Sequence, residues 1–475
     1  MVQTLNREYI KVQLERLKKH DTGKSLDILP FLANKNKPIK GKFNNILGEY
    51  VRNISGIKEN SLKGKKSDFY ISSEDNETSE LIADEVKITN DDDKYDFVRF
   101  LNQFLFNQKE IKPIHPFLFN YIKVDKAKQN EYGKYARFMN EVLVKDNEEI
   151  KAIFSNKETE DILTELILNK LDTLQGNLEK KSVDFKKSNH YQPLLPSLSK
   201  KYQEDMIYLS QFKDYFLTSF PMLTNFYAFM YVCQLSFKFE QFTEADFDST
   251  QPLYFSLEWE TVNKRRKVVE GLEGYKYIRG ISSNLFPHIH TISQLSHNTL
   301  NEPFDENEKI PFIPYSELLK QIQGQGKEYE KAFLSELKQW IKEYSLWANV
   351  DIPDHSNTIP EAFKVLFHCL KAGTNSDVAK KYGENIEDLG SPFLKSRGNS
   401  GKVFNVKHDF LLLLTAVSVK NKRMPLNELF VEFEKRGIAF DRYSKKEIIT
   451  LFDNHNILDK KSDSGDAQYV KPILL

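Results

Sequence analysis

Three residues in the first part of the chain have the spacing of a metal-dependent nuclease. Asp68, Glu85 and Lys87 form a D…ExK pattern, in which carboxylates hold a magnesium ion and the attacking water is activated beside it. The segment 74–96 around them contains ten Asp or Glu residues, so this spacing arises easily by chance, and no convincing strand precedes Glu85. A divergent magnesium-dependent nuclease is therefore kept as an alternative function.

A second stretch comes close to the phosphate-binding loop of an ATPase. Residues 396–403, "SRGNSGKV", have Ser396 where the first glycine is required and Val403 where a magnesium-binding Ser or Thr should follow Lys402. We therefore expect no ATP hydrolysis by this chain. A basic linker is the favoured interpretation, in which Arg397 and Lys402 are candidate contacts for DNA phosphate.

Histidines and cysteines provide the remaining candidates for metal or nucleophile chemistry. His288, His290 and His297 lie in "PHIHTISQLSH", and neutral imidazoles bind zinc well. His288 and His290 are expected on one side of a strand, but no nearby carboxylate or cysteine completes a site. Cys233 and Cys369 lie in apolar helical stretches, which favours buried free thiols in a reducing compartment. We predict no metal, no cofactor and no catalytic residue.

Phosphate binding near the carboxy terminus is the clearest chemical signal. The whole chain has 68 Lys plus Arg against 68 Asp plus Glu, whereas residues 391–475 have fifteen against ten. A local positive excess in a neutral chain favours duplex DNA as a local partner. The predicted DNA-binding residues are Arg442, Tyr443, Lys445, Lys446, Lys460, Lys461, Arg397 and Lys402.

Three helices, a short strand and a hairpin must position these basic residues. Residues 408–420, "HDFLLLLTAVSVK", are apolar nearly all round and predict a buried helix. The next helix is expected from Pro425 to Gly437, because proline favours the first turn and glycine the end of a helix. A strand at 438–440 follows.

A third helix is expected to start at Ser444, with Glu447 completing a capping box. After it, "NILDKK" and "AQYVK" flank a turn in which Gly465 supplies the positive φ of a hairpin. This order of elements predicts a winged helix, whose third helix enters the major groove of DNA. Asp463 and Asp466 in the hairpin would repel phosphate, so docking of a partner protein stays open as an alternative role.

The fold class expected for the whole chain is mainly α (α+β), as a multidomain helical body with a C-terminal winged-helix domain. A chain of 475 residues, 40% of them apolar, is long enough for several cored domains. The expected domains are residues 1–180, largely helical with an acidic loop at 74–96; residues 195–390, helical with a strand-containing segment near 252–278; and residues 391–475, the winged helix.

One uncharged segment is compatible with either a membrane-spanning helix or a buried core helix. Residues 215–237 carry no charge and are long enough to cross a bilayer. Polar residues dilute the stretch, and Pro221 favours a buried core helix that starts or kinks at that point. The amino terminus has no apolar run of signal-peptide type. We therefore expect a cytoplasmic protein with no membrane partner.

The carboxy-terminal part also resembles a known family. "FNVKHDFLLLLTAVSV", "PLNELFVEFEKRGIAFDRYSKKEI" and "KKSDSGDAQYVKPIL", within residues 404–474, resemble the DptG family, components of the phosphorothioation-dependent DNA restriction systems (Dnd/Dpt) of bacteria. The specific match is confined to this region, although "YFSLEWE" near residue 255 is also similar.

This resemblance implies a non-catalytic subunit of a phage-defence complex. It implies DptF and DptH, ATPase-type subunits, as partners, and DNA lacking the phosphorothioate mark as the target. No catalytic motif is established in the family, so the resemblance implies no catalytic residue. A pure protein–protein scaffold and the divergent nuclease remain the alternatives.

Overall fold

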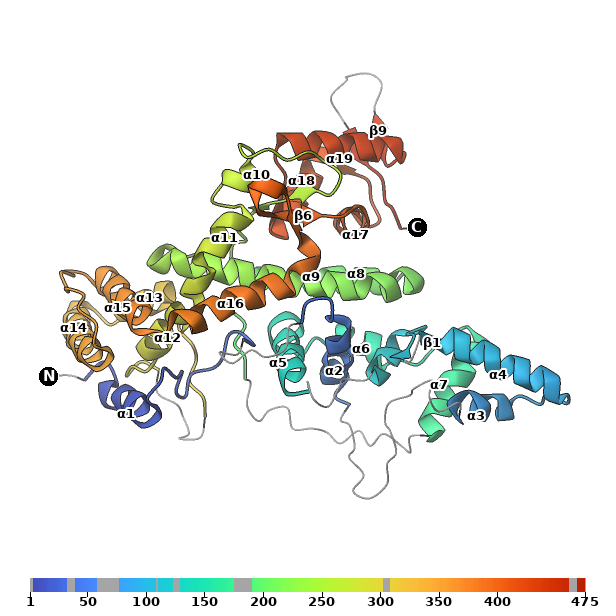
Figure 1. The fold of residues 1–475 in the computed structure, drawn as a ribbon, viewed down its shortest axis with the longest axis horizontal. Helices are drawn as coiled ribbons and strands as arrows, with labels where there is room; N and C mark the ends of the chain where they lie inside the picture. The colour runs from blue at the N-terminus through green and yellow to red at the C-terminus, as the bar shows by residue number, and fades with distance from the viewer. Residues whose placement is uncertain are drawn as a thin grey trace. The chain divides into compact units, whose positions relative to one another are not determined.

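The computed structural model describes residues 3–31, 39–57, 77–107, 110–122, 129–174, 190–301, 308–460 and 468–474. These residues are mainly helical with several small sheets, which confirms the predicted fold class at this level (Figure 1). The chain forms two compact units, of which unit 1 contains Met1–Gly41, Lys186–Lys201 and Phe226–Leu475, and unit 2 contains Lys42–Phe185 and Tyr202–Asn225. The domain limits expected from the sequence stay a prediction, because compactness does not decide which segments fold alone.

The described residues of unit 2 form helices and a two-stranded ribbon. Strands β1 (Phe106–Asn107) and β2 (Glu110–Ile111) pair antiparallel. Its described helices are α2 (Asn44–Ser55), α3 (Glu77–Glu85), α4 (Asp91–Leu105), η1 (Pro116–Tyr121), α5 (Gln129–Met139), the π-helical η3 (Asn140–Val144), α6 (Glu148–Ser155) and α7 (Ile162–Leu174). Helices α8 (Pro196–Ser210) and α9 (Lys213–Glu240) contribute residues to both units.

The acidic segment 74–96 contains helices in place of the predicted loop. Its described part supplies α3 and the start of α4. The Asn90 side chain accepts a hydrogen bond of 3.1 Å from the backbone N–H of Asp92, and three aspartates occupy the first turn of α4. Negative side chains are favourable at a helix N-terminus because of the helix dipole. The clustered acids therefore begin a helix.

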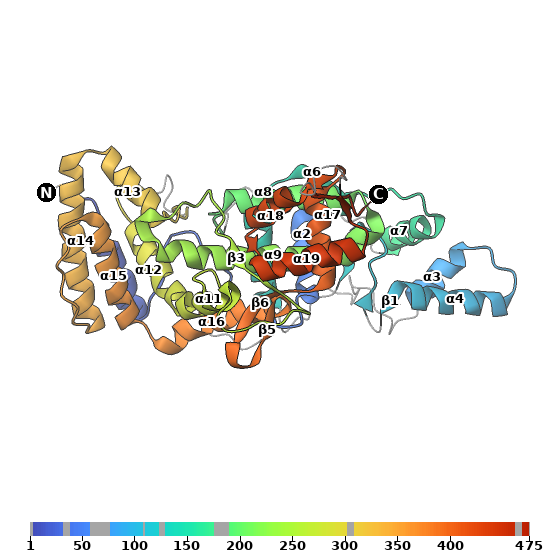
Figure 2. The same cartoon turned by 90° about the horizontal axis from the view of Figure 1, so that it is seen from above.

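Unit 1 contains most of the helices that the structure describes. They are α1 (Arg7–Leu17), α10 (Lys267–Glu270), α11 (Tyr275–Ile281), α12 (Leu285–Ser296), α13 (Tyr315–Gly324), α14 (Lys327–Ala348), α15 (Ile359–Gly373), α16 (Ser376–Leu389), α17 (His408–Val419), α18 (Leu426–Lys435) and α19 (Arg442–Asn454). Short 3-10 turns are η4 (Phe242–Glu244), η5 (Ser282–Asn284), η6 (Ser391–Phe393) and η7 (Gly398–Ser400). Helices α14 and α15 lie side by side in both views (Figures 1 and 2).

Strands of unit 1 pair segments from the middle of the chain with segments near its carboxy terminus. They are β3 (Leu253–Tyr254), β4 (Ser256–Leu257), β5 (Leu394–Ser396), β6 (Lys402–Val406), β7 (Met424–Pro425), β8 (Ile438–Ala439), β9 (Leu458–Lys460) and β10 (Gln468–Val470). Strand β3 pairs in parallel with β8, and β4 pairs in parallel with β6. Strands β7, β10 and β9 form a separate antiparallel sheet in that order.

The elements after residue 407 follow the predicted order closely. Helices α17, α18 and α19 occur where the sequence predicts three helices, and β9 and β10 form the predicted hairpin. The predicted strand at 438–440 exists as β8, but its partner is β3, about 185 residues earlier in the chain, with Leu253 opposite Ile438. This pairing joins Leu253 and Tyr254 to the strand that precedes the predicted DNA-binding helix.

An aromatic core holds the end of the chain against α9. The Phe226 ring lies 4.9 Å from that of Phe410 and 5.6 Å from that of Phe393, measured between centroids. The Phe229 ring stacks on Phe393 at 5.9 Å and meets Phe404 at 6.1 Å. Rings buried in this way contribute large apolar areas to a core. Residues 391–475 therefore share their core with α9.

The uncharged stretch 215–237 lies inside α9, and its later part is a buried helix as predicted. Tyr227, Val232 and Cys233 are fully buried. Pro221 is an interior residue of α9, which begins eight residues earlier at Lys213. Of the two predicted alternatives at Pro221, the helix start is therefore wrong, and the kink stays a prediction. Among the residues that the structure describes, no helix has the length and apolar character needed to cross a membrane.

Candidate nucleic-acid interface

Helix α19 begins two residues earlier than the sequence predicts, and its cap is Asp441. The Asp441 carboxylate accepts hydrogen bonds of 3.0 Å from the backbone N–H groups of Tyr443 and Ser444. These bonds satisfy donors that the helix itself leaves unpaired. The predicted capping box of Ser444 and Glu447 is therefore wrong, because Arg442 and Tyr443 already belong to the first turn of α19.

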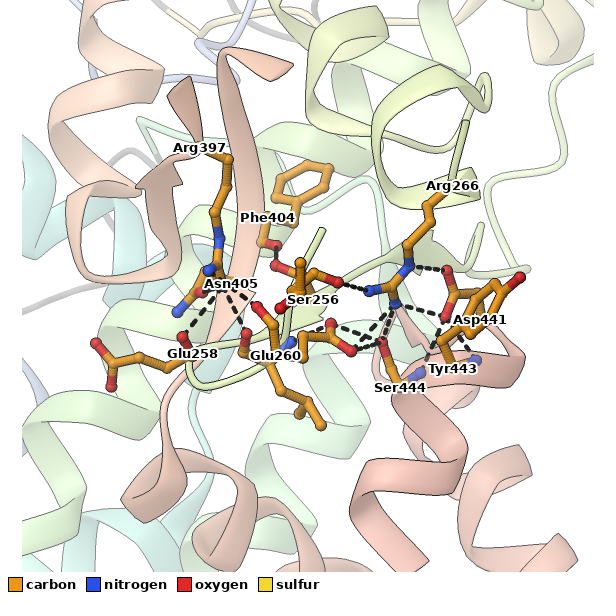
Figure 3. Close-up of polar contacts among 12 residues, drawn as sticks. Ser256, Glu258, Glu260, Arg266, Arg397, Phe404, Asn405, Asp441, Tyr443 and Ser444 are labelled. Carbon is orange, nitrogen blue, oxygen red and sulfur yellow. Dashed lines mark hydrogen bonds and ion pairs between the residues drawn. The ribbon is translucent and has the colours of Figure 1, made fainter. Parts of the chain in front are cut away.

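A buried ion network fixes this end of α19 to the loop after β4. The Arg266 guanidinium donates from Nε and Nη2 to the two oxygens of Asp441, at 2.8 and 2.7 Å. It also donates to Glu260 at 3.1 Å and to the Ser444 hydroxyl at 2.8 Å (Figure 3). All four side chains are at least 93% buried. Bidentate pairing of arginine with carboxylate defines direction as well as distance, so the network orients the first turn of α19.

Ser444 and Glu260 complete the network. The Ser444 hydroxyl donates to the Glu260 carboxylate at 2.9 Å, and that carboxylate also accepts the backbone N–H of Leu257 at 2.7 Å. Ser444 therefore links α19 to the loop, which explains its complete burial. The sequence pattern predicts a helix start at Ser444, because serine is common at helix N-termini. A serine that binds a distant carboxylate cannot be told from it by sequence.

Charge pairing shifts the ionisation of the network. Burial favours the neutral carboxyl of Asp441, but hydrogen bonds from Arg266 and from the Ser444 backbone outweigh burial and lower its pKa. Burial also favours the neutral guanidine of Arg266, yet its bond to Asp441 and the charge of Glu260 prevail and raise its pKa. Both groups are thus charged at neutral pH, and two carboxylates share one guanidinium.

The predicted DNA contact Arg397 is engaged inside unit 1. Its guanidinium donates to the backbone carbonyls of Leu257 at 2.6 Å and Glu260 at 3.1 Å, and to the Asn405 side chain at 3.2 Å (Figure 3). These bonds hold the same loop that carries Glu260. Arg397 therefore holds the loop that contacts the start of α19, and its guanidinium N–H groups donate to groups within the protein.

The predicted DNA contact Lys402 is also paired with an internal partner. Its ammonium binds the Glu387 carboxylate, which also pairs with Arg279 at 2.6 Å. Burial works to raise the pKa of Glu387, but hydrogen bonding and charge from Lys402 together with Arg279 lower it. The structure does not bring Arg397 or Lys402 together with the basic residues of α19.

The exposed residues of the first turns of α19 remain available to a ligand. Arg442 and Lys446 are exposed, and Tyr443 is 49% exposed. The Arg442 guanidinium lies 4.7 Å from the centre of the Tyr443 ring. Lys445 is half-buried, with its ammonium 4.8 Å from the centre of the Phe430 ring on α18. The predicted set therefore separates into outward-facing residues and one that packs on α18.

Two further basic residues from the middle of the chain join this surface. They belong to the cluster Lys264–Lys267, whose composition is typical of an exposed basic turn. Arg266 is the buried member, while its neighbours Lys264 and Arg265 are exposed. Because Arg266 binds Asp441, the loop carrying these neighbours lies at the start of α19. We call Lys264, Arg265, Arg442 and Lys446 the basic surface.

Only part of the predicted wing lies in the described structure. Lys460 is the last residue of β9, and its backbone pairs with Gln468 of β10. Lys461, Asp463 and Gly465 lie outside the described residues. Beside the hairpin, Arg423 lies over the Tyr469 ring at 5.5 Å from its centre.

His288 and His290 lie on α12, so the prediction of a strand is wrong, and His297 is the residue that follows this helix. His288 of α12 contacts the Tyr315 hydroxyl at 3.2 Å and Glu240 at 3.3 Å. Burial lowers the pKa of His290 to about 3 and that of His297 to about 4. Each imidazole has different neighbours, since residues two apart on a helix point in different directions.

The positions of Glu85 and Lys87 do not support the nuclease alternative. Glu85 ends α3 and Lys87 follows it, both exposed and without a strand between them, while Asp68 lies outside the described residues. In the part of the chain that the structure describes, no group of three or more His, Cys, Asp or Glu side chains is arranged to hold a metal ion. The basic surface is therefore the better candidate site.

No protein-family model matches the chain, and no curated protein shows significant similarity to it.

Proposed function

We propose that this protein is a non-catalytic subunit that binds duplex DNA through a winged helix formed by its last 85 residues. The observation that carries the proposal is the position of Arg442, Tyr443 and Lys446 on the exposed first turns of α19. Basic and aromatic side chains at the start of a recognition helix reach phosphates and base edges in a major groove. The hairpin of β9 and β10 follows α19 as a wing does.

The support beneath α19 strengthens this proposal. A helix that reads DNA must be held rigidly, because a small displacement misplaces every contact. The bidentate pair of Arg266 with Asp441 and the bond from Ser444 to Glu260 supply that rigidity. The same network adds Lys264 and Arg265 to the surface. Sequence-independent phosphate contacts of this kind provide most of the affinity of a protein for DNA.

The likeness of the carboxy-terminal sequence to the DptG family supplies the biological setting of the proposal. In this setting the chain assembles with the ATPase-type subunits DptF and DptH in a bacterial restriction complex, and it helps that complex act on phage DNA lacking phosphorothioate. The chain itself contributes assembly and DNA binding. The partners supply ATP hydrolysis.

The test is duplex DNA binding across a salt series by the full chain and a charge-reversal variant. Arg442→Glu combined with Lys446→Glu should weaken binding at least tenfold at low salt. It should also reduce the slope of log K against log salt by about 2, because each lost phosphate contact removes nearly one released counterion. The salt slope separates loss of phosphate contacts from loss of folding.

A matched control has the same change in net charge elsewhere in unit 1. Lys320→Glu on α13 with Lys342→Glu on α14 alters two exposed lysines, and it should leave affinity and slope unchanged. Equal weakening in both variants, or unchanged binding in the α19 variant, would rule out α19 as the DNA-reading element. Deleting residues 391–475 is a poor test, because it removes Phe393, Phe404 and Phe410 from the core of α9.

A scaffold is the second candidate function, and acidic residues on α19 favour it. Glu447 and Asp453 are both exposed, and carboxylates on a DNA-facing helix repel phosphate. In that case the α19 variant should keep its affinity for DNA and lose co-purification with DptF or DptH. The two measurements on the same variant therefore distinguish the two roles.

A further inference from the structure

Two histidines that are distant in sequence face each other at the surface of unit 1. His408 is the first residue of α17, and His455 is the residue that follows α19. Their Nε2 atoms are 3.4 Å apart, and their ring centroids are 5.2 Å apart. The two residues are separated by 47 positions, so no local motif indicates the pair.

The distance between the two nitrogens suits a shared metal ion better than a hydrogen bond. Hydrogen bonds from N–H donors are usually about 2.7–3.2 Å long, so 3.4 Å is a weak contact for two rings that turn their nitrogens toward each other. Zinc binds imidazole nitrogen at about 2.0–2.1 Å in tetrahedral geometry, which places two such nitrogens about 3.4 Å apart. The observed separation equals the separation that one zinc ion requires.

The neighbours of His408 fit the same role. The Asp409 carboxylate lies 3.5 Å from Nδ1 of His408 and is 90% exposed, so without a metal ion the two groups are only in weak contact. A zinc-bound imidazole usually donates its other N–H to a carboxylate or carbonyl, which orients the ring. The Trp259 ring also lies near the His408 ring, at 6.1 Å between centroids. Of the two ring nitrogens of His408, Nε2 is the one that faces His455.

The pair is open to solvent. The His408 side chain is 38% exposed, and His455 is exposed. Within the described residues no third histidine, cysteine or carboxylate is placed to share the ion, so two positions of a tetrahedral zinc would be filled by water. Imidazole donors favour first-row ions such as zinc, nickel and copper over magnesium or calcium.

We propose that His408 and His455 form an open zinc-binding site that joins the start of α17 to the end of α19. Each residue supplies Nε2, while Nδ1 of His408 is turned toward Asp409. The site is independent of the proposed DNA binding, because it lies at the opposite end of α19 from Arg442 and uses none of the basic surface. A bound ion would fix the two helices to each other.

The test is calorimetric titration of zinc chloride into the metal-free full chain in a buffer that does not chelate metals. We expect one zinc ion per chain and at least tenfold weaker binding in His408→Ala and in His455→Ala. His355→Ala is the matched control, because His355 is an exposed histidine elsewhere in unit 1, and it should bind as the unaltered protein does. His455 is exposed and His408 is partly exposed, and circular dichroism would verify that each variant remains folded.

Thermal unfolding gives a second readout. Zinc should raise the unfolding midpoint of the unaltered protein and of His355→Ala, since a ligand that binds only the folded state stabilises it, and it should not raise that of the other two variants. The proposal is overturned if the unaltered chain takes up no zinc, if both variants keep its affinity, or if only one of the two replacements weakens binding.

Discussion

At the scale of single residues, Arg266 contacts more of the residues that hold the first turn of α19 than any exposed basic side chain does. It is 95% buried and binds Asp441, Glu260 and Ser444, which all support the first turn of α19. Two buried carboxylates depend on this one guanidinium for charge compensation. A buried ion pair adds little net stability, but removing one partner leaves the other charge uncompensated.

Replacement of Arg266 should therefore destabilise the protein strongly. Arg266→Met leaves Glu260 and Asp441 buried without a cation, and we expect the free energy of unfolding to fall by about 3–5 kcal/mol. Urea denaturation followed by circular dichroism measures the change. Arg265→Met is the control, because Arg265 is the exposed neighbour and its loss should change stability by less than about 0.5 kcal/mol. Equal effects of the two replacements would contradict the structural role of the network.

At the scale of elements, the turn between α18 and β8 sets the position of α19. Gly437 has φ +85°, a backbone conformation that side chains with a Cβ atom rarely adopt. A Cβ atom at this position would lie 2.6 Å from the sulfur of Met230 on α9. The carbonyl of Gly437 also accepts the N–H of Leu253, at 2.8 Å. The positive φ and the close approach of Met230 thus both favour glycine there, and the backbone bond to Leu253 holds the turn against β3.

Gly437→Ala should destabilise the protein more than the same replacement at a glycine that has a positive φ but no close neighbour. Backbone strain of about 1–2 kcal/mol and crowding of about 1 kcal/mol or more should together lower the free energy of unfolding by about 2–3 kcal/mol. Gly398→Ala is the control, since Gly398 has φ +52° and a Cβ atom added there would meet no other atom within 4 Å. This control should lose only about 1 kcal/mol. Urea denaturation of both variants measures the difference, and equal losses would contradict the close approach of α9.

At the scale of the whole molecule, buried and half-buried carboxylates that are paired with cations make the stability of the fold depend on pH. Burial works to raise the pKa of Glu432, but hydrogen bonds from Lys435 and Arg436 and the charge of Lys201 lower its pKa to about 2, from 4.5. Asp441 has a pKa lowered in the same direction. Between the lowered and ordinary values, the unfolded chain binds protons that the folded chain does not. The contribution of Glu432 is therefore present above pH 4.5 and is lost as pH falls toward 2.

A urea series at pH 7, 5, 4 and 3 should show this loss. We expect the stability of the unaltered protein to be nearly constant between pH 7 and 5 with respect to Glu432, and to fall below pH 4.5. After allowance for solvent screening, Glu432 should account for about 1–2 kcal/mol of the fall between pH 5 and 3. Glu432→Gln should be less stable at pH 7 and should lose correspondingly less between pH 5 and 3. The same acid dependence in both proteins would contradict the lowered pKa of Glu432.

Local patterns in the sequence were sufficient for the elements near the site. The apolar residues of 408–420, the Pro425 and Gly437 positions and the hairpin residues predicted α17, α18, β9 and β10 to within about two residues. Helices and hairpins depend on hydrogen bonds and side chains within a few positions of each other, so their signals are local. The start of α19 is predicted two residues too late, at Ser444, because a serine that caps a helix and a serine that binds a distant carboxylate look alike in sequence.

By itself, the sequence determined that the protein is mainly helical, that three helices and a hairpin end the chain, and that basic residues gather at the start of the third helix. Only the tertiary structure decided which basic residues are exposed. Arg266 is buried against Asp441, 175 positions away, while Arg397 and Lys402 bind groups within unit 1, and His408 meets His455. Each outcome depends on a contact between distant segments, and such contacts follow from how the core packs, which no local pattern of residue types contains.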